Sequence, residues 1–333
     1  MKGFVIDRYK PSDGGRIAEV PDPVPTDGQV VVEVHAAGVN QLDAKIRDGE
    51  FKLILRYPMP LVLGNDVAGV VVSVGAGASR FRVGDEVYAR PNSSAIGTFA
   101  ELIALDEADV ALKPASLTMA EAGSVPLVGL TAWQALVERA NLQPGERVFI
   151  QAGSGGVGTV AIPLAKHLGA TVATTTSAAN FDLVKSLGAD VVLDYRHQDF
   201  ETILSDYDVV LHSQDRTALE KSLRVLRPGG RLVSISGPPD PAFADEIGAP
   251  WYVKPLLCAT SATIRRAARR RKVDYSFLFM RADGAQLAEI TALIDAGAVR
   301  PVLDRTFPFA STNDAIACVE SGRARGKVVV AMR

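Results

Sequence analysis

Short apolar runs separated by turn residues characterise the chain from residue 1 to about residue 122. Runs such as QVVVEVHAAGV, DVAGVVVSVGAG and TFAELIALD are rich in β-branched residues and are bounded by glycine, proline and aspartate. Such a series of short strands is typical of a small antiparallel barrel or sandwich. We therefore expect an all-β domain in this part of the chain.

The apolar pattern changes at about residue 123. Bare apolar runs such as RVFIQAG, TVATTT and DVVLDY alternate with amphipathic segments such as NFDLVKSLGA and TALEKSLRVL. Strands without polar alternation, each followed by a helix, predict a parallel sheet that is covered on both faces. The sequence Pro228-Gly229-Gly230 predicts the end of a helix that runs to Leu226. After about residue 308 the chain returns with one helix and a terminal strand.

Composition narrows the class of protein. A chain of 333 residues is long enough for two domains, and 47% hydrophobic with 22% charged residues is typical of a globular protein. The formal net charge of -2 gives no reason to expect a nucleic-acid or membrane partner. We see neither an apolar run long enough to span a membrane nor a secretory signal, and so expect a cytoplasmic protein. Two distant cysteines predict neither a disulfide framework nor a cysteine-based metal site.

A glycine-rich turn carries the first chemical signal. Gly153, Gly155 and Gly158 satisfy the pattern G-x-G-x-x-G, directly after a predicted strand and at the start of a predicted helix. That context distinguishes a dinucleotide-binding turn from an ordinary strand-to-helix turn, which is the alternative interpretation. The helix N-terminus supplies free N–H groups to a diphosphate. The candidate ligands are Ser154, Gly155, Gly156 and Val157.

The acid that usually follows such a turn is absent. An Asp or Glu at the end of the second strand normally binds the ribose 2'-hydroxyl of NAD. Here the strand ends in Thr175, Thr176 and Ser177, and the first carboxylate, Asp182, lies inside the next predicted helix. Hydroxyls and backbone N–H groups accept a 2'-phosphate that a carboxylate would repel, so we expect NADPH. The alternative is that the threonines are only good strand formers, and the nearest cation is Lys185.

Nearly the whole chain resembles the medium-chain dehydrogenase/reductase superfamily. The resemblance rests on LGNDVAGVVVSVGAGASRFRVGDEVYA, on GSVPLVGLTAWQALVERANLQPGERVFIQAGSGGVGTVAIPLAKHLGA, and on AGAVRPVLDRTFPFASTNDAIACVESGRARGKVVV. It implies an α/β protein with a GroES-like β catalytic domain and an inserted Rossmann domain, with the cofactor in the cleft between them. The expected limits are 1–122 with about 300–333 for the catalytic domain, 123–265 for the NADP-binding domain, and 266–299 for a return segment facing cofactor and substrate.

Zinc alcohol dehydrogenases of this superfamily have a cysteine where this chain has Asn40, and Gly-His-Glu where it has Gly64-Asn65-Asp66. A catalytic zinc needs about three N or S side chains in one place. We therefore expect no metal, and we interpret His212, at the end of a predicted strand, as a capped histidine near the cofactor rather than a metal ligand. The remaining resemblance is to the zinc-independent quinone oxidoreductases and alkenal (enone) reductases, which implies hydride transfer from NADPH to a quinone or an α,β-unsaturated carbonyl. A non-catalytic NADPH-binding protein, crystallin-like or redox-sensing, is the alternative, and a zinc alcohol dehydrogenase is the third.

The resemblance also suggests individual residues. Asn40 and Tyr57 are the catalytic candidates, because either could donate to an acceptor oxygen; their alternatives are a turn asparagine and a surface tyrosine. Near the cofactor it places Thr131, Tyr195, Phe279 and Lys327, the last two through the segment YSFLFM and the run RGKVVV. For Lys327, a solvated strand flank is an equal alternative. By analogy the partners are a small quinone or enone and a second copy in a homodimer. The basic run 265–272 is interpreted as a solvated helix end.

Overall fold

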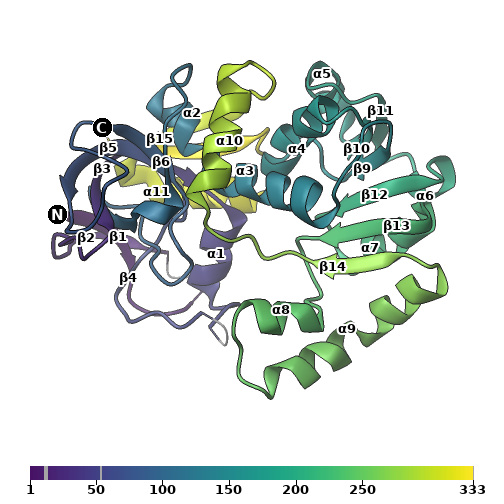
Figure 1. Cartoon of the computed structure of the whole chain (residues 1–333), viewed down its shortest axis with the longest axis horizontal. Helices are drawn as coiled ribbons and strands as arrows, with labels where there is room; N and C mark the ends of the chain where they lie inside the picture. The colour runs from purple at the N-terminus through teal and green to yellow at the C-terminus, as the bar shows by residue number, and fades with distance from the viewer. Residues whose placement is uncertain (11–13, 53–54, 333) are drawn as a thin grey trace. The chain divides into compact units, whose positions relative to one another are not determined.

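The structure, a computed structural model, describes residues 1–10, 14–52 and 55–332 (Figure 1). The chain forms two compact units. Unit 1 contains Met1–Leu130 and Arg281–Arg333, and unit 2 contains Thr131–Met280. The excursion of the chain into unit 2 and its return confirm an inserted domain, and helix α3 (Pro126–Trp133) contains the residue pair at which the chain leaves unit 1.

Unit 1 is built on strands of short, apolar sequence. A seven-stranded sheet has the order β15-β16-β3-β5-β6-β8, with β7 also paired to β3, and a three-stranded sheet has the order β2-β1-β4. Neighbouring strands are antiparallel except β15 and β16. The strands are β1 (Lys2–Ile6), β2 (Arg16–Glu19), β3 (Gln29–Val39), β4 (Leu61–Val62), β5 (Val67–Val74), β6 (Glu86–Ala89), β7 (Leu102–Asp106), β8 (Val110–Leu112), β15 (Leu303–Pro308) and β16 (Lys327–Ala331).

Strand β3 organises this unit because it pairs with β5, β7 and β16, and its valines enter the core. Close backbone approach requires glycine where β3 meets β5: a Cβ on Gly69 would lie 1.9 Å from the Glu33 carbonyl oxygen. The helices of unit 1 are α1 (Gln41–Asp48), α2 (Met119–Gly123), α10 (Gly284–Asp295) and α11 (Thr312–Glu320), in addition to α3.

Unit 2 is a doubly wound sheet of six parallel strands in the order β11-β10-β9-β12-β13-β14. Helix α4 packs on β9 and β10, α5 packs on β10 and β11, and α7 packs on β12 and β13 (Figure 1). Its strands are β9 (Arg147–Ile150), β10 (Thr171–Thr176), β11 (Val191–Asp194), β12 (Tyr207–His212), β13 (Leu226–Ser234) and β14 (Asp274–Phe277). Its helices are the π-helical turn Gln134–Arg139, α4 (Gly156–His167), α5 (Phe181–Ser186), α6 (Phe200–Ile203), α7 (Arg216–Val225), α8 (Pro241–Glu246) and α9 (Val253–Arg270).

The strand order confirms the α/β fold class predicted from the apolar runs. The helix end predicted before Pro228-Gly229-Gly230 is confirmed to within one residue: α7 ends at Val225, and strand β13 begins at Leu226 and runs through these three residues. The register of β13 against β12 shifts between Tyr207 and Val209, so an irregularity accommodates these three residues. The strand order changes direction between β9 and β12: β10 and β11 lie on one side of β9, and β12, β13 and β14 lie on the other. Ligands of such sheets bind at the carboxyl ends of the strands at that point.

Candidate functional site

The turn between β9 and α4 forms a backbone cradle in unit 2. A Cβ on Gly153 would lie 2.2 Å from Thr174 Oγ1, and one on Gly158 would lie 2.5 Å from the Ala152 carbonyl oxygen. A Cβ on Gly155 would meet only that same oxygen, at 3.3 Å, so space remains above the loop. Ala152 itself has φ 53°, a strained conformation for a residue with a side chain. The first amides of α4, from Gly156 on, have no partner within the helix by geometry and are suited to a diphosphate.

A neutral polar corner lies beside this cradle. Thr176 donates its hydroxyl to Ser154 Oγ at 2.7 Å, and Asn180 Nδ2 approaches Ser154 Oγ at 3.1 Å and Ser177 Oγ at 3.4 Å. The buried Asn180 Oδ1 has no hydrogen-bond partner among the described residues. No carboxylate takes part in these contacts. Sequence reasoning identified Ser154, Thr176 and Ser177 and missed Asn180, which the turn after β10 brings to them.

A cation stands close to the same strand ends. Thr176 pairs with Asp194 across β10 and β11, and the Tyr195 amide donates to the Thr176 carbonyl at 3.3 Å. Tyr195 is 59% exposed, and the Arg196 guanidinium lies 5.7 Å from the centre of its ring. Sequence reasoning found no arginine at the tip of β10, because only the residues that follow β10 along the chain were candidates. Arg196 reaches this region from the end of the neighbouring strand.

His212 occupies the carboxyl end of β12 at the point where the strand order reverses. Its ring is completely buried, and neither ring nitrogen has a hydrogen-bond partner among the described residues. The Gln214 backbone, two residues further along the chain, acts on the ring and opposes the effect of burial on its pKa, so the capped histidine stays a prediction. Burial lowers the pKa of His212 to about 4, so the imidazole is neutral near pH 7. The open glycine cradle, at the carboxyl ends of these strands, fits a polar ligand such as a dinucleotide.

Two further cofactor candidates also lie in unit 2. Thr131, in α3, is 5% exposed. Phe279 follows β14 and packs on Phe243, with ring centroids 5.7 Å apart. Neither the burial of Thr131 nor the ring contact of Phe279 tests whether these residues bind a cofactor, so both assignments stay predictions.

Unit 1 contains a buried polar cluster around Lys327. The ammonium group donates to Asn40 Oδ1 at 2.5 Å, to Asp66 Oδ2 at 3.1 Å and to the Val39 carbonyl oxygen at 3.2 Å. Asn40 Nδ2 donates to the same Asp66 oxygen at 2.9 Å and to the Gly38 carbonyl at 3.3 Å. Lys327 is 5% exposed and is not a solvated strand flank. All three N–H groups of Lys327 and both of Asn40 therefore already have acceptors.

Asp43 extends this cluster. The start of α1 is fixed by the Asn40 amide, which donates to Asp43 Oδ2 at 2.7 Å, and Asn65 Nδ2 donates to Asp43 Oδ1 at 2.7 Å. Burial is the largest effect on this carboxyl and raises its pKa to about 7 despite both hydrogen bonds. The nearby negative charge of Asp66 acts in the same direction, and the charge of Lys327 opposes it.

Tyr57 and Arg90 are neighbours of the cluster with contrasting partners. Tyr57 donates its hydroxyl to the Ser93 carbonyl oxygen at 2.5 Å, and burial raises its pKa to about 12. Arg90 is 1% exposed and donates from Nη1 to the Pro91 carbonyl oxygen at 2.7 Å, while its Nε has no partner among the described residues. Sequence reasoning missed Arg90, since an arginine at the end of a strand gives no signal of its burial.

This donor set does not fit a catalytic zinc. Asn40, Asn65 and Asp66 offer two amides and one carboxylate, and the Lys327 ammonium is bonded to two of these three side chains. A cation that is already bonded to the carboxylate competes with a metal, and amides are poor zinc ligands. Within the described residues no group of three or more His, Cys, Asp or Glu side chains is arranged to hold a metal ion.

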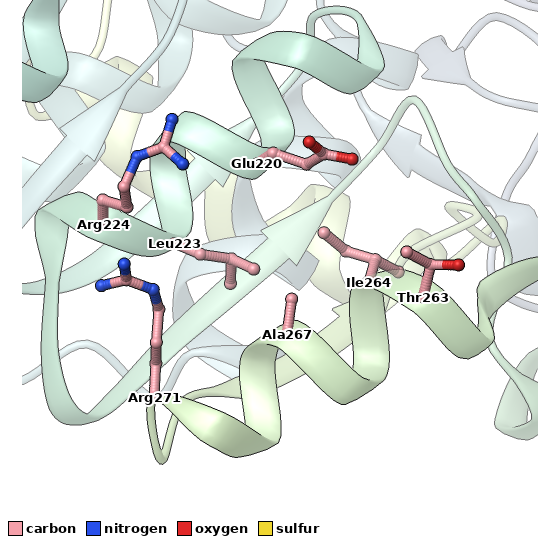
Figure 2. A pocket seen from close by; sticks show the side chains of 7 residues that line it. All are labelled: Glu220, Leu223, Arg224, Thr263, Ile264, Ala267 and Arg271. Carbon is pink, nitrogen blue, oxygen red and sulfur yellow. The ribbon is translucent and has the colours of Figure 1, made fainter.

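One groove in unit 2 lies between α7 and α9 and has a volume of ≈ 200 Å³. Figure 2 shows Leu223, Ile264 and Ala267 between the two helices, with Arg224 and Arg271 at one end. It contains none of the predicted site residues. The basic run 265–272 covers the exposed C-terminal end of α9, as predicted. Over the same described ranges, no helix is both long and apolar enough to cross a membrane.

Comparisons with known proteins show that this chain is similar to oxidoreductases. Residues 26–115 match the family "Alcohol dehydrogenase GroES-like domain", and residues 187–330 match "Zinc-binding dehydrogenase". The 2-methylene-furan-3-one reductase of Solanum lycopersicum is 36% identical over 91% of this chain and 71% of that protein. The NADPH-dependent alkenal/one oxidoreductase of Arabidopsis thaliana is 34% identical over 99% of this chain and 79% of that protein.

A solved structure agrees. The quinone oxidoreductase from Coxiella burnetii has a TM-score of 0.87 and 28% sequence identity, and the alignment covers 100% of this chain and 99% of that one.

Proposed function

We propose that this chain, which belongs to the quinone oxidoreductase and alkenal/one reductase branch of the medium-chain dehydrogenase/reductase superfamily, uses NADPH to reduce a quinone or an α,β-unsaturated carbonyl compound. The observation that carries the cofactor is the neutral corner of Ser154, Thr176, Ser177 and Asn180 beside the glycine cradle. A carboxylate at that place would repel a 2'-phosphate, and no side chain in the corner is acidic.

The residues of unit 2 would hold the dinucleotide by its diphosphate and its 2'-phosphate. The amides that begin at Gly156 would bind the diphosphate, and the hydroxyl corner with Tyr195 and Arg196 would bind the 2'-phosphate. NADPH supplies a hydride when it is bound.

The two catalytic candidates belong to unit 1. Asn40 and Tyr57 stay the catalytic candidates, but each now has its N–H or O–H groups committed within the protein. Asn40 Oδ1 accepts one hydrogen bond and retains a lone pair, so Asn40 is better suited to accept a hydrogen bond, for instance from a ribose hydroxyl, than to donate one. The homodimer and the cytoplasmic location suggested by the resemblance also stay predictions.

The experiment is to mix the purified protein with NADPH and a panel of quinones and enones, and to follow the loss of the reduced cofactor by its absorbance. We expect turnover of at least one class of acceptor, with NADPH preferred to NADH. Tight NADPH binding without turnover of any acceptor would favour the alternative of a non-catalytic NADPH-binding protein. Tighter binding of NADH than NADPH would contradict the assignment of the corner.

A further inference from the structure

Helix α9 and the residues next to it carry a dense positive charge that the net charge of the chain does not reveal. Residues 251–272 contain seven Lys and Arg residues and no Asp or Glu, whereas the whole chain has a formal net charge of -2. Six of the seven lie in the basic run 265–272. The net charge gave no reason to expect an anionic partner because it is a sum over the whole chain, and this local excess disappears in it.

The cations of the basic run have no carboxylate partners. Among the seven, only Lys254 forms an ion pair in the described part of the chain, with Asp245 at 2.7 Å. The neighbouring helix α7 is different, because each of its three cations is paired with a carboxylate of unit 2. These ion pairs are Arg216–Glu220, Lys221–Asp199, Lys221–Glu201 and Arg224–Glu201. Unit 2 thus neutralises the cations of α7 and leaves those of the basic run free for another anion.

The end of the helix accounts for only part of this charge. Cations in the last turn of a helix interact favourably with its C-terminal carbonyl groups, and the effect is confined to about one turn. Arg269 and Arg270 lie in that turn, whereas Arg265 and Arg266 lie before it. The like charges of the full run repel one another, which is a cost to the folded protein that an anionic partner would remove.

An exposed apolar group lies at the other end of the helix. Trp251 is 85% exposed, Tyr252 is 60% exposed and Leu256 is 58% exposed. The centres of the two aromatic rings lie 6.0 Å apart, so these rings contact each other rather than the core. Large apolar side chains that are exposed side by side are typical of a binding surface.

The apolar group and the basic run share one face of α9. Exposed residues at spacings of three and four form a single stripe from the first turn of the helix to its last. They are Leu256, Ala259, Thr263, Arg266 and Arg270. A different face is buried, and α9 packs with it on α7, α8 and β14 (Figure 1). The stripe is therefore not needed for the packing of unit 2.

An anionic bilayer matches both ends of the stripe. A second copy of the stripe would supply no carboxylate, because residues 251–272 contain none. A nucleic acid would bind the arginines through its phosphates but would offer nothing apolar to Leu256. The phosphates of anionic lipids attract the arginines, and Trp, Tyr and Leu side chains are stabilised at the boundary between headgroups and acyl chains.

We propose that the exposed stripe of α9, together with Trp251 and Tyr252, docks on an anionic lipid bilayer. The arginines of the basic run bind lipid phosphates, and Trp251, Tyr252 and Leu256 enter the boundary between headgroups and acyl chains. The docking surface shares no residue with the glycine cradle, so it does not depend on the proposed function.

Sedimentation with lipid vesicles provides the first test. The unaltered chain is mixed with vesicles of phosphatidylcholine and phosphatidylglycerol in equal parts, and with vesicles of phosphatidylcholine alone. We expect it to sediment with the mixed vesicles only, and binding to weaken as salt is added because salt screens the attraction. The triple variant Arg266→Gln, Arg269→Gln, Arg270→Gln should bind the mixed vesicles about 100-fold more weakly.

The matched control changes the same charge on the neighbouring helix. The triple variant Arg216→Gln, Lys221→Gln, Arg224→Gln alters the net charge of the chain equally, but it removes cations that unit 2 already neutralises. We expect it to bind the mixed vesicles like the unaltered chain. Equal losses in the two triple variants would show that the total charge of the protein, not the stripe of α9, determines binding.

Tryptophan fluorescence tests the apolar end. The chain has two tryptophans, Trp133 and Trp251. On mixed vesicles we expect the emission to move to shorter wavelength and quenching by acrylamide to decrease, as an exposed indole leaves water. Trp251→Phe should abolish both changes and still sediment with the vesicles. The same changes in Trp251→Phe would assign the signal to Trp133 and refute insertion of Trp251.

Two other outcomes would overturn the proposal. The first is that the unaltered chain fails to bind the mixed vesicles or binds phosphatidylcholine vesicles equally well. The second is that it binds a single-stranded RNA oligonucleotide more tightly than the mixed vesicles, which would assign the basic run to a nucleic acid. No measurement here uses turnover, so a failure of the proposed function leaves the test of α9 intact.

Discussion

The dinucleotide cradle of unit 2 and the buried polar cluster of unit 1 are built in opposite ways. The cradle is one continuous turn, Ala152–Gly158, that offers backbone groups and space. The cluster joins Asn40, Asp66 and Lys327, which are 26 and 261 residues apart in sequence, through side chains alone. Binding to a backbone site should be lost when a side chain is added to it, whereas a cluster of buried charges should be destabilised when one charged group is removed.

The largest effect should come from Gly158→Val in the cradle. The new Cβ would lie 2.5 Å from the Ala152 carbonyl oxygen and 2.6 Å from Gly153 Cα, and both are backbone atoms that cannot move aside cheaply. We expect NADPH binding to fall below detection in calorimetry, with a lower thermal unfolding temperature. Gly155→Ala is the control: its Cβ meets nothing closer than 3.3 Å, so the fold should persist while NADPH binding weakens. Normal NADPH binding by Gly158→Val would contradict the cradle.

In the cluster, Lys327→Met should be strongly destabilising, because it leaves the completely buried Asp66 carboxylate without its ammonium partner. Removing one partner of a buried ion pair costs about 3–5 kcal/mol in the free energy of unfolding. The double variant Lys327→Met with Asp66→Asn removes both charges and should recover part of this loss. Urea unfolding of the single and double variants measures the coupling. Strictly additive losses would mean that the two side chains do not act as a pair.

Stability should also depend on pH through Asp43. Its pKa is about 7 in the folded protein, against 3.8 for an ordinary aspartate carboxyl, so the folded state holds the proton more tightly than the unfolded state. The contribution of Asp43 to the free energy of unfolding is therefore highest below pH 4, falls as the pH rises toward 7 and levels off above it. The total change is at most about 4 kcal/mol.

Asp43→Asn tests this pH dependence, because an amide at position 43 does not titrate. If the Asn65 amide turns over, its unpartnered Oδ1 can accept from the new amide, so the contacts can be retained. Urea unfolding across this pH range should show a flatter profile for Asp43→Asn than for the unaltered chain. Identical profiles would show that Asp43 is not the titrating group.

The smallest effect concerns Arg196, which follows β11 beside the neutral polar corner. Arg196→Ala should weaken NADPH binding by about 10-fold, the loss of one charge-assisted contact, and leave NADH binding unchanged. Lys185→Ala is the matched control, since Lys185 lies on α5 and is the cation that sequence order alone would suggest. Calorimetry with both dinucleotides measures the difference. Equal losses for NADPH and NADH, or a larger loss from Lys185→Ala, would argue against Arg196.

The cradle could be predicted because its chemistry is local. Glycine spacing, a preceding apolar run and a following helix are all contained in residues 147–167, and the parallel strands and the acid-free end of β10 were equally visible. Register between neighbouring strands was not visible, so Arg196 was missed, and the side-chain contacts made by the turn after β10 were not visible either, so Asn180 was missed. The helix end near Leu226 was also predicted, but the sequence did not show that strand β13 begins before Pro228-Gly229-Gly230 and continues through these residues.

The sequence by itself determined the fold class, the glycine turn and the absence of zinc-type side chains at positions 40 and 64–66. Only the tertiary structure decided which polar groups are paired. It joined Lys327 to Asn40 and Asp66, directed the Tyr57 hydroxyl to the Ser93 carbonyl oxygen, and left Arg90 Nε buried without a partner among the described residues. The physical reason is that backbone conformation follows from neighbours along the chain, whereas burial and hydrogen-bond saturation depend on atoms that folding brings from hundreds of residues away.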